Sequence, residues 1–361
     1  MSFNFYLFRG IRFLLLPVSI LAGIYIRLRN ILYDNGWFKS ASFNLPIICV
    51  GNLSVGGTGK SPMTEYLLEL LSTRFESAVL SRGYKRKTSG YLLANENTSA
   101  LEIGDEPMQF HKKFPHVAVA VGEERIEAIP QLLHDKPETQ IIILDDAFQH
   151  RAIRAGFNII LTDFSNPYWF DTFLPTGDLR DNRTSAGRAD VIVVSKCPED
   201  ISIGKKQEIL DHVKPLPHQK IFFSAIEYGH PYHISTRQHI VLDKSLEVLL
   251  VCGIANPLPL KNHLEKHVES YFEKNFDDHH IFSIDDWKEI VEKFNSLDAG
   301  QKIILTTEKD AVRLEKFGEL LMELPLYVLP IRHKFLFDEG AQFELAVLDF
   351  AENFPRTTPT D

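Results

Sequence analysis

The sequence of 361 residues has few cysteines, no excess of positive charge and no long apolar run. Its three cysteines, Cys49, Cys197 and Cys252, are far apart and form no CxxC pair. This argues against a disulfide scaffold or a cysteine zinc site and fits a reducing cytosolic setting. The 39 lysines and arginines against 48 aspartates and glutamates give a net charge of −9. We therefore expect no nucleic-acid partner, and nothing in the sequence predicts a protein partner.

The first 33 residues differ from the acidic chain as a whole, because they contain four arginines and no acidic residue. The 14 uncharged residues 13–26 are too few to cross a bilayer, which needs about 20. A secretory signal is also disfavoured, since no A-x-A-like site follows and Arg27 and Arg29 directly trail the apolar run. Residues 1–33 are therefore predicted to form a helix that docks on the cytoplasmic face of a membrane. The alternative is a buried helix of the globular core.

From residue 45 onward, short apolar runs alternate with helical stretches, which predicts a layered α/β fold. Several runs are continuously apolar, as expected for parallel strands covered on both faces. The predicted strands of a first unit are residues 46–51, 78–81, 117–121, 141–144, 158–162 and 191–195, and those of a second unit are 248–252, 303–306 and 326–329. We expect one domain over 34–225 and a smaller α/β domain over 226–361.

Residues 51–62, GNLSVGGTGKSP, follow the first predicted strand and open an amphipathic helix. Glycines let backbone N–H groups surround a phosphate, and the N-terminus of the helix adds partial positive charge. The predicted nucleotide-binding loop consists of Ser54, Val55, Gly56, Gly57, Thr58, Gly59, Lys60 and Ser61. The strict G-x-x-x-x-G-K-[ST] pattern is not met, because Ser54 stands at its first glycine. The alternative is a glycine-rich turn without a ligand.

The predicted strand 141–144 ends in two acids, Asp145 and Asp146. A carboxylate at this place beside a phosphate loop holds Mg²⁺, directly or through water. Acids at a strand end are also common in solvated turns. Together with the Lys60–Ser61 pair, however, they predict a Mg²⁺ site beside the phosphate loop.

Three further clusters leave two interpretations open. In GDEP, residues 104–107, Asp105 is either a base that accepts a hydroxyl proton or the N-cap of a helix over 108–113. In DDHH, residues 277–280, a histidine beside a carboxylate is either a proton relay or part of a solvated loop. In SRGYKRK, residues 81–87, four positive charges suggest an anionic ligand, to which Arg151 and Arg154 could contribute, or a solvated basic loop.

The chain contains, in this order, the motifs GNLSVGGTGKSP, LSRGYKR, GDEP, VGEER, LDDAFQHR, LPTGDLRD, the DHH run and TEKDAVRL. Taken together, these motifs resemble the tetraacyldisaccharide 4′-kinase family of Gram-negative bacteria over almost the full length. The resemblance implies ATP-dependent phosphorylation of the 4′-hydroxyl of a tetraacyldisaccharide 1-phosphate, giving lipid IVA. It also implies a peripheral protein of the inner membrane, with the active site in a cleft between two α/β domains.

The resemblance assigns roles to matching residues. It makes Asp105 the base and His279 its dyad partner, with Lys60 on the phosphates. The implied metal ligands are Ser61, Glu106, Asp145 and Asp146. The implied substrate contacts are Arg82, Tyr84, Lys85, Arg125, Gln149, His150 and Arg151. Two positions depart from the family pattern: Ser61 replaces the more usual threonine but keeps the hydroxyl, and Asp181 stands where glutamate is expected, which leaves its role in doubt.

The combined expectation is a P-loop NTPase-like parallel-sheet domain, a smaller α/β domain and an N-terminal membrane-associated helix. A membrane-associated P-loop ATPase or GTPase of the partitioning or metallochaperone type is the alternative. A GTPase is disfavoured because the chain lacks the N-K-x-D motif that guanine-specific proteins usually carry. SKCP at 195–198 lacks the aspartate, and TEKD at 307–310 has the wrong spacing. A soluble nucleoside or sugar kinase would leave the first 33 residues unexplained.

Overall fold

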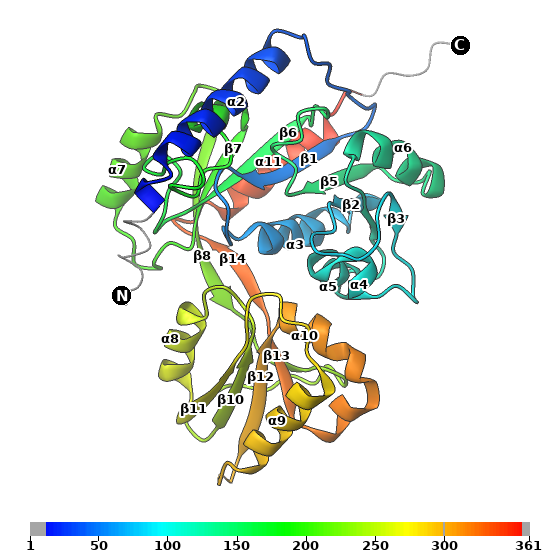
Figure 1. Ribbon diagram of the computed structural model, residues 1–361, viewed down its shortest axis with the longest axis vertical. Helices are drawn as coiled ribbons and strands as arrows, with labels where there is room; N and C mark the ends of the chain where they lie inside the picture. Colours follow the sequence, from blue (N-terminus) through cyan, green and yellow to red (C-terminus); the bar gives the residue numbers. More distant parts are fainter. Residues whose placement is uncertain (1–11, 299, 356–361) are drawn as a thin grey trace.

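The computed structural model describes residues 12–298 and 300–355, which form two α/β units (Figure 1). Nine strands of the described chain form a larger sheet in the order β14-β8-β7-β6-β1-β5-β2-β4-β3, and five form a smaller sheet in the order β11-β10-β12-β13-β9. Neighbouring strands run parallel except for β14, β3 and β9, which lie at sheet edges. The predicted α/β fold with a large parallel sheet is therefore confirmed.

The larger sheet consists of β1 (Ile47–Asn52), β2 (Ser77–Ser81), β3 (Leu92–Leu93), β4 (Ala118–Val121), β5 (Ile141–Asp145), β6 (Phe157–Asp163), β7 (Val191–Ser195), β8 (Lys220–Tyr228) and β14 (Ile331–Phe335). The smaller sheet consists of β9 (Tyr232–His233), β10 (Glu247–Cys252), β11 (Ser270–Asn275), β12 (Lys302–Thr307) and β13 (Leu326–Leu329). The helices are α2 (Leu16–Asp34), α3 (Lys60–Leu71), α4 (Ala100–Ile103), α5 (Asp105–Lys113), α6 (Arg125–Asp135), α7 (Ile203–Val213), α8 (Leu258–His267), α9 (Ile284–Asn295), α10 (Glu308–Leu314) and α11 (Gly340–Glu352), with 3₁₀ helices η1 (Arg183–Arg188) and η2 (Glu315–Glu323).

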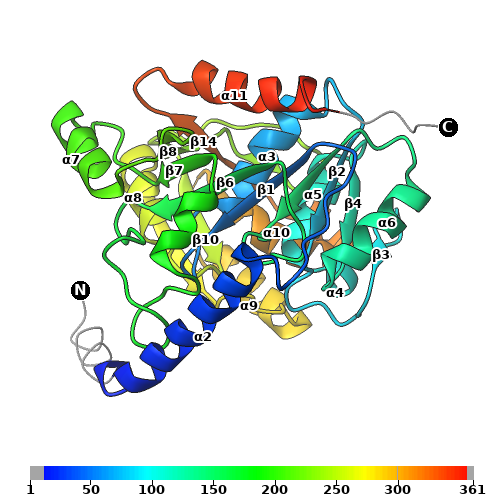
Figure 2. The same cartoon turned by 90° about the horizontal axis from the view of Figure 1, so that it is seen from above.

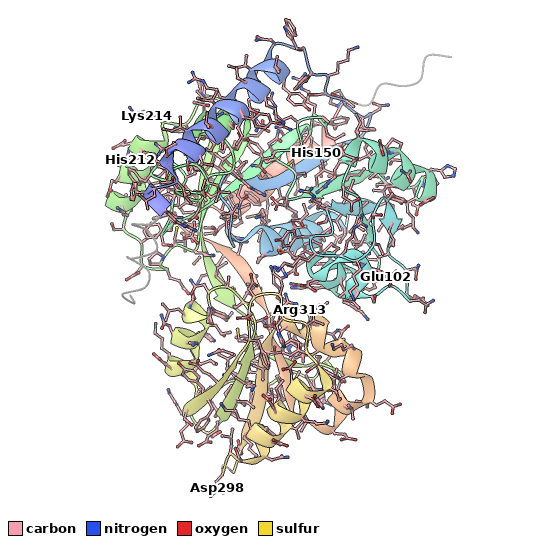
Figure 3. The ribbon with its side chains drawn as sticks, in the orientation of Figure 1. Glu102, His150, His212, Lys214, Asp298 and Arg313 are labelled. Atoms are coloured by element: carbon pink, nitrogen blue, oxygen red, sulfur yellow. The ribbon has the colours of Figure 1, made fainter. Side chains whose placement is uncertain are left out.

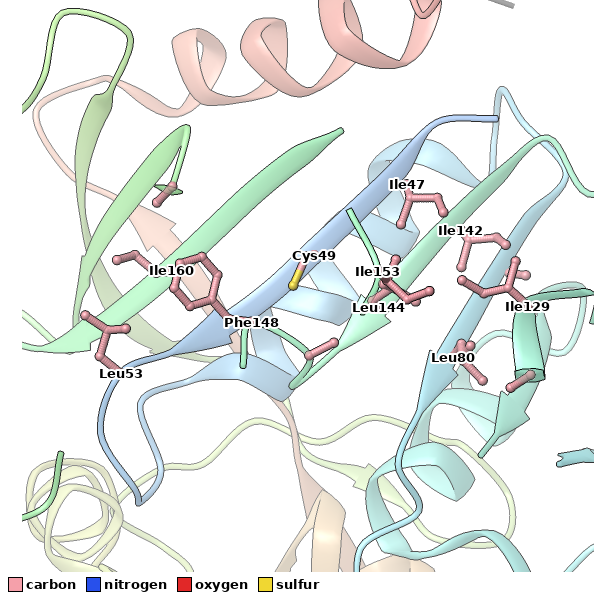
Figure 4. Packing of buried hydrophobic residues seen from close by; sticks show 14 of the residues in the cluster. Ile47, Cys49, Leu53, Leu80, Ile129, Ile142, Leu144, Phe148, Ile153 and Ile160 are labelled. Carbon is pink, nitrogen blue, oxygen red and sulfur yellow. The ribbon is translucent and has the colours of Figure 1, made fainter. Parts of the chain in front are cut away.

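The central strands of the larger sheet are buried on both faces, which explains their continuously apolar sequences. In β1, Ile47 and Cys49 pack in the cluster on one face (Figure 4), while Ile48 and Val50 pack in the cluster on the other. Val50 pairs in register with Asp145 of the parallel strand β5. The carboxyl ends of β1 and β5, and the loops that follow them, therefore lie side by side at one edge of the sheet.

Helices cover both faces of the larger sheet. The cluster around Ile48 includes Met63 and Leu67 of α3 together with Phe343 and Val347 of α11. Helix α6 contributes to the cluster on the opposite face. Seen from above, α11 and α2 lie on opposite sides of the sheet (Figure 2). The phosphate-loop helix α3 thus shares one face of the sheet with a helix from the other end of the chain.

The chain passes between the two units through the antiparallel pair β8 and β14. After β8 it enters the smaller sheet at β9, and after β13 it returns along β14 to α11. Division of the chain at 33/34 and 225/226 remains a proposal, and within it we place residues 331–352, which contain β14 and α11, with the larger unit. The physical reason is that α11 buries its apolar face in the core of the larger sheet.

Helix α2 ends at Asp34, and the predicted helix of residues 1–33 lies partly outside the described residues, as does Arg9. The helix buries Ser19, Gly23 and Asn30, whereas its large apolar side chains are exposed. The alternative of a buried core helix is therefore wrong, because the polar side of the helix faces the protein. None of the described helices is long and apolar enough to span a membrane.

The packing of α11 can be tested by truncating Phe343, which is fully buried between α11 and the sheet. Phe343→Ala is expected to lower the free energy of unfolding by about 3–5 kcal/mol, because it removes a buried ring and leaves a cavity. The matched control is Leu345→Ala on the same helix, where the side chain is 65% exposed and the expected change is within about 0.5 kcal/mol. Urea unfolding of both variants gives the values, and equal losses would contradict this placement of α11.

Candidate active site

The predicted nucleotide-binding loop joins the end of β1 to the start of α3. Gly56 and Gly59 have φ values of 103° and 87°, a left-handed conformation that glycine adopts without strain. Gly59 is the residue directly before the helix, so the first N–H groups of α3 and its positive dipole end face the loop. These are the features of an anion-binding helix N-terminus.

Residues from neighbouring segments fix the backbone of this loop. The N–H of Val55 donates to the carbonyl oxygen of Asp178 at 2.7 Å, and the N–H of Arg180 donates to that of Leu53 at 2.8 Å. On the other side, the hydroxyl of Ser195 donates to the carbonyl oxygen of Thr58 at 2.7 Å. Protein groups on both sides of the loop therefore hold its backbone in place.

A buried histidine from β14 completes this support. Nε2 of His333 donates to the carbonyl oxygen of Gly59 at 2.9 Å, and the hydroxyl of Ser224 donates to its Nδ1 at 2.9 Å. Burial lowers the pKa of His333 to about 4, so the ring is neutral at physiological pH. Both ring nitrogens have a hydrogen-bond partner only in the tautomer that carries its proton on Nε2 and leaves Nδ1 as an acceptor.

Asp145 and Asp146 follow β5 into very different surroundings. Asp145 is buried and accepts hydrogen bonds from the hydroxyls of Ser81 and Thr64 at 3.1 and 3.3 Å. Burial, together with the carboxylates of Glu106 and Asp146, raises the pKa of Asp145 to about 7. Its negative charge has hydroxyl donors beside it, but it forms no ion pair with any described residue.

Asp146 is instead surrounded by cations. Arg180 donates to both of its carboxylate oxygens, and Nζ of Lys60 lies 3.7 Å from Oδ2. Burial alone would raise the pKa of Asp146, but Lys60 and Arg180 outweigh it and hold this pKa below the ordinary range. Lys60 itself has a lowered pKa because it is buried.

The oxygen donors around the loop match the preference of Mg²⁺ for hard ligands. The hydroxyl of Ser61 hydrogen-bonds Glu106, whose carboxylate also accepts from Lys309 at 2.5 Å. Within residues 12–298 and 300–355, no three histidine, cysteine or acidic side chains form a metal cage of their own. Mg²⁺ in nucleotide sites needs only one or two carboxylates, with phosphates and water as its other ligands. Ser61 and the ion-pair-free Asp145 fit that requirement.

The acid of GDEP and the first histidine of the DHH run meet across the two units. Nδ1 of His279 lies 3.0 Å from Oδ2 of Asp105, although 174 positions separate them. Asp105 is the first residue of α5, and Gly104 occupies the N-cap. The capping interpretation is therefore wrong for this side chain. His279 has a φ of 63°, a strained conformation for a residue with a Cβ, which indicates that the fold holds it in place.

The exposed part of the basic run borders this pair. The ring of Tyr84 lies edge-on to that of His279 with 5.7 Å between centroids, and the exposed Lys85 lies over the Tyr84 ring. Arg82 is exposed on the same loop. Arg86 differs, because its guanidinium forms a 2.6 Å ion pair with Glu123 and so belongs to the scaffold.

The other predicted contacts surround the loop after β5. Gln149 donates to the carbonyl oxygen of Asn52 at 2.7 Å. Nε2 of His150 accepts the backbone N–H of Arg125 at 3.3 Å, and the Arg125 side chain is buried (Figure 3 labels His150). Arg151 points elsewhere: its guanidinium contacts the carbonyl oxygen of Asn30 and the carboxylate of Asp34 in helix α2.

Asp181, the position that departs from the family pattern, also contacts α2. Its buried carboxylate accepts from Asn30 at 2.8 Å, from Ser185 at 2.8 Å and from Arg188 at 3.1 Å. These contacts join α2 to η1. They give Asp181 a role in the scaffold.

The family model of tetraacyldisaccharide-1-P 4′-kinases matches residues 11–350. The chain belongs to this family. It is 46% identical over 345 residues to the tetraacyldisaccharide 4′-kinase of Flavobacterium johnsoniae, covering 94% of this chain and 97% of the relative. It is 40% identical over 358 residues to the one from Bacteroides thetaiotaomicron, covering 95% and 94%. A crystal structure of LpxK from Aquifex aeolicus in complex with ATP is similar with a TM-score of 0.72 at 29% identity, covering 94% of this chain and 99% of that one.

Membership of this kinase family confirms the predicted enzyme class, a kinase of lipid A biosynthesis, and disfavours the partitioning ATPase and the GTPase. The kinase site also contains residues that motif reasoning did not single out. Arg180 contacts Asp146, Lys309 contacts Glu106 and Arg313 contacts Asp105. All three lie within the quoted motifs LPTGDLRD and TEKDAVRL, which was the available signal.

The neutral state of His333 predicts an acid sensitivity of the kinase fold. The unfolded chain takes up a proton near pH 6.5 and the folded chain only near pH 4, so acidification favours unfolding. Between pH 7 and about pH 5, this group is expected to remove about 2 kcal/mol of stability. Urea unfolding at both pH values should show a smaller loss for His333→Gln, with the exposed His218→Gln behaving like wild type. Equal losses in all three proteins would contradict a neutral His333.

Proposed function

We propose that this kinase transfers the γ-phosphoryl group of ATP to the 4′-hydroxyl of a tetraacyldisaccharide 1-phosphate, giving lipid IVA. The observation that carries the proposal is the meeting of Asp105 and His279 beside the phosphate loop. The residue after Asp105 is Glu106, which hydrogen-bonds Ser61 of that loop. A hydroxyl placed against Asp105 would therefore lie next to the end of the triphosphate.

In this proposal the acceptor hydroxyl oxygen forms a bond to the γ-phosphorus, while the bond from that phosphorus to the β–γ bridging oxygen breaks and ADP leaves. The hydroxyl proton passes to Asp105, and His279 orients the carboxylate and shares the proton. Phosphoryl transfer depends on positioning and charge neutralisation. Backbone N–H groups of the loop and Lys60 would hold the phosphates. Arg180 would fix Asp146.

Mg²⁺ is part of the same proposal. Ser61 and Asp145 would hold it, with Glu106 and Asp146 as the adjacent carboxylates. When bound, the cation neutralises charge on the β- and γ-phosphates. The raised pKa of Asp145 is consistent with this assignment, because it reflects burial and, beyond that, the neighbouring carboxylates of Glu106 and Asp146, whose repulsion a cation would relieve.

The proposed lipid substrate requires an enzyme that works at a membrane surface, and α2 provides a docking surface. Its large exposed apolar side chains are Leu16, Val18, Ile20, Leu21, Ile24, Tyr25, Leu28 and Ile31. The helix is fixed to the protein by polar contacts, including a 2.7 Å hydrogen bond between Ser19 and Thr176. We propose that this face lies in the cytoplasmic leaflet of the inner membrane, with the exposed Arg27 near anionic headgroups.

For the substrate itself we propose contacts with the basic loop. Tyr84 borders His279, Lys85 lies over the Tyr84 ring, and Arg82 is exposed on the same loop, so the three suit an anionic sugar phosphate. Arg125, Gln149 and His150 surround the neighbouring loop and would contribute to its shape. The guanidinium of Arg151 is engaged by α2, so the proposal does not rely on it.

Transfer of labelled phosphate from ATP to tetraacyldisaccharide 1-phosphate in detergent micelles tests the reaction. Wild type should label the lipid, and Asp105→Asn should lower kcat by about 100-fold or more, since it removes the base but keeps the shape. Asp211→Asn, on the exposed face of α7, is the matched control and should retain full activity. An undiminished kcat of Asp105→Asn would show that Asp105 is not the base. ATP hydrolysis by wild type without labelled lipid would show that this lipid is not the phosphoryl acceptor.

Membrane docking is tested separately by vesicle flotation with phosphatidylglycerol-containing vesicles. Replacing Ile20, Leu21 and Ile24 together by serine should reduce the vesicle-bound fraction about tenfold or more, because three exposed apolar side chains no longer enter the bilayer. The control replaces by serine three exposed apolar residues outside α2, Ile203, Leu258 and Met322, which together are more exposed than the three in α2. Equal binding of the two triple variants would contradict docking through α2.

A further inference from the structure

Arg313 of α10 is a buried cation that contacts the proposed base. Its Nε and Nη2 atoms lie 2.9 and 2.8 Å from Oδ2 of Asp105. Only 7% of the residue is exposed. Figure 3 shows Arg313 at the junction of the two units. The contact therefore spans the same junction as the Asp105–His279 pair.

The other end of the guanidinium is fixed within the smaller unit. Nη1 of Arg313 donates to Oδ1 of Asp310 at 3.0 Å. Asp310 is fully buried, and its Oδ2 accepts the backbone N–H of Gly253 at 3.0 Å and the hydroxyl of Thr307 at 2.8 Å. A planar guanidinium held at one edge presents its remaining N–H groups in one direction. Asp310 thus orients Arg313 towards Asp105.

Arg313 and His279 meet at one oxygen of the base, and Nη2 of Arg313 also lies 3.2 Å from Nδ1 of His279. Oδ2 of Asp105 faces two N–H groups of Arg313 and the ring nitrogen Nδ1 of His279. Oδ1 has no hydrogen bond from any residue in the described ranges 12–298 and 300–355. A carboxylate held through one oxygen cannot rotate freely, so its second oxygen keeps a fixed direction.

Joining the two units does not by itself require Arg313. Lys113 of α5 pairs with Glu308 of α10 at 2.9 Å, and Lys112 pairs with Glu315 just beyond α10 at 3.4 Å. These ion pairs join the same two segments without touching Asp105. The contact of Arg313 is directed at the base itself.

We propose that Arg313 is a positioning residue for phosphoryl transfer, which holds Asp105 through Oδ2 so that Oδ1 is presented to the acceptor hydroxyl. Asp310 acts indirectly, because it orients the guanidinium of Arg313 that holds Asp105. The proposal rests on the proposed function of Asp105 as the base. The guanidinium of Arg313 is engaged by Asp105, Asp310 and His279, so its effect is expected in kcat and not in the KM for ATP.

The experiment measures kcat and the KM for ATP of the full chain with tetraacyldisaccharide 1-phosphate in micelles. Arg313→Met should lower kcat about 100-fold, as expected when a catalytic group loses its orientation, and leave the KM for ATP within about twofold. Arg313→Lys keeps the positive charge but lacks the planar guanidinium, so its kcat should be about tenfold higher than that of Arg313→Met. The lysine variant also serves if the methionine variant does not fold.

Two comparisons separate positioning from a structural role. Adding Asp105→Asn to Arg313→Met should cost little beyond Asp105→Asn alone, because both act through one group. Lys112→Met, which removes only an ion pair between the same segments, should keep kcat within about twofold. Multiplied losses in the double variant, a raised KM for ATP with unchanged kcat, or near-normal kcat in both Arg313 variants would overturn the proposal. Absence of labelled lipid from wild type would instead contradict the proposed function.

Discussion

The ion pairs between α5 and α10 are the interaction on which the candidate site depends. Asp105 and Glu106 belong to the larger unit, while Arg313 and Lys309, which pair with them, belong to the smaller one. Breaking such a partly buried pair leaves an uncompensated charge, so together with the Lys113–Glu308 and Lys112–Glu315 pairs these contacts fix the relative position of the two helices more than they add stability. Asp105 and His279, which lie on the two sides of this junction, meet because it is in place.

The phosphate loop has a second set of dependencies, which reach the docking helix. Thr176 hydrogen-bonds Ser19 of α2, and two residues further on the carbonyl oxygen of Asp178 accepts the N–H of Val55 in the loop. A single short segment therefore lies between the proposed membrane-facing helix and the nucleotide site. This arrangement fits the proposal that the lipid substrate is reached at a membrane surface and ATP from water.

The sequence predicted the parts of this structure that depend on local pattern. The apolar strands β1 and β5, the glycine loop and the acids after β5 all follow from neighbouring residues. The Asp105–His279 contact was expected only through the family resemblance, since no local signal joins positions 174 apart. Their catalytic roles stay predictions.

The parts that were missed depend on tertiary contacts. Strand β14, with the sequence IRHKF, mixes polar and apolar residues and gains its stability from pairing with β8 and from the buried His333. The return of α11 to the larger sheet cannot be inferred from its own sequence, because an apolar helix face does not specify which sheet it covers. Arg180 and Arg313 resemble ordinary surface arginines until the fold brings acids to them.

The path of the chain also sets the order in which the two units are completed during synthesis. Every strand of the smaller sheet lies within residues 232–329, whereas the larger unit receives β14 and α11 only from residues 331–352. A chain emerging from the ribosome can therefore close the smaller sheet first. The strand that carries His333 to the carbonyl oxygen of Gly59 is made after the whole smaller sheet, so the nascent protein has His279 before its phosphate loop is fully supported.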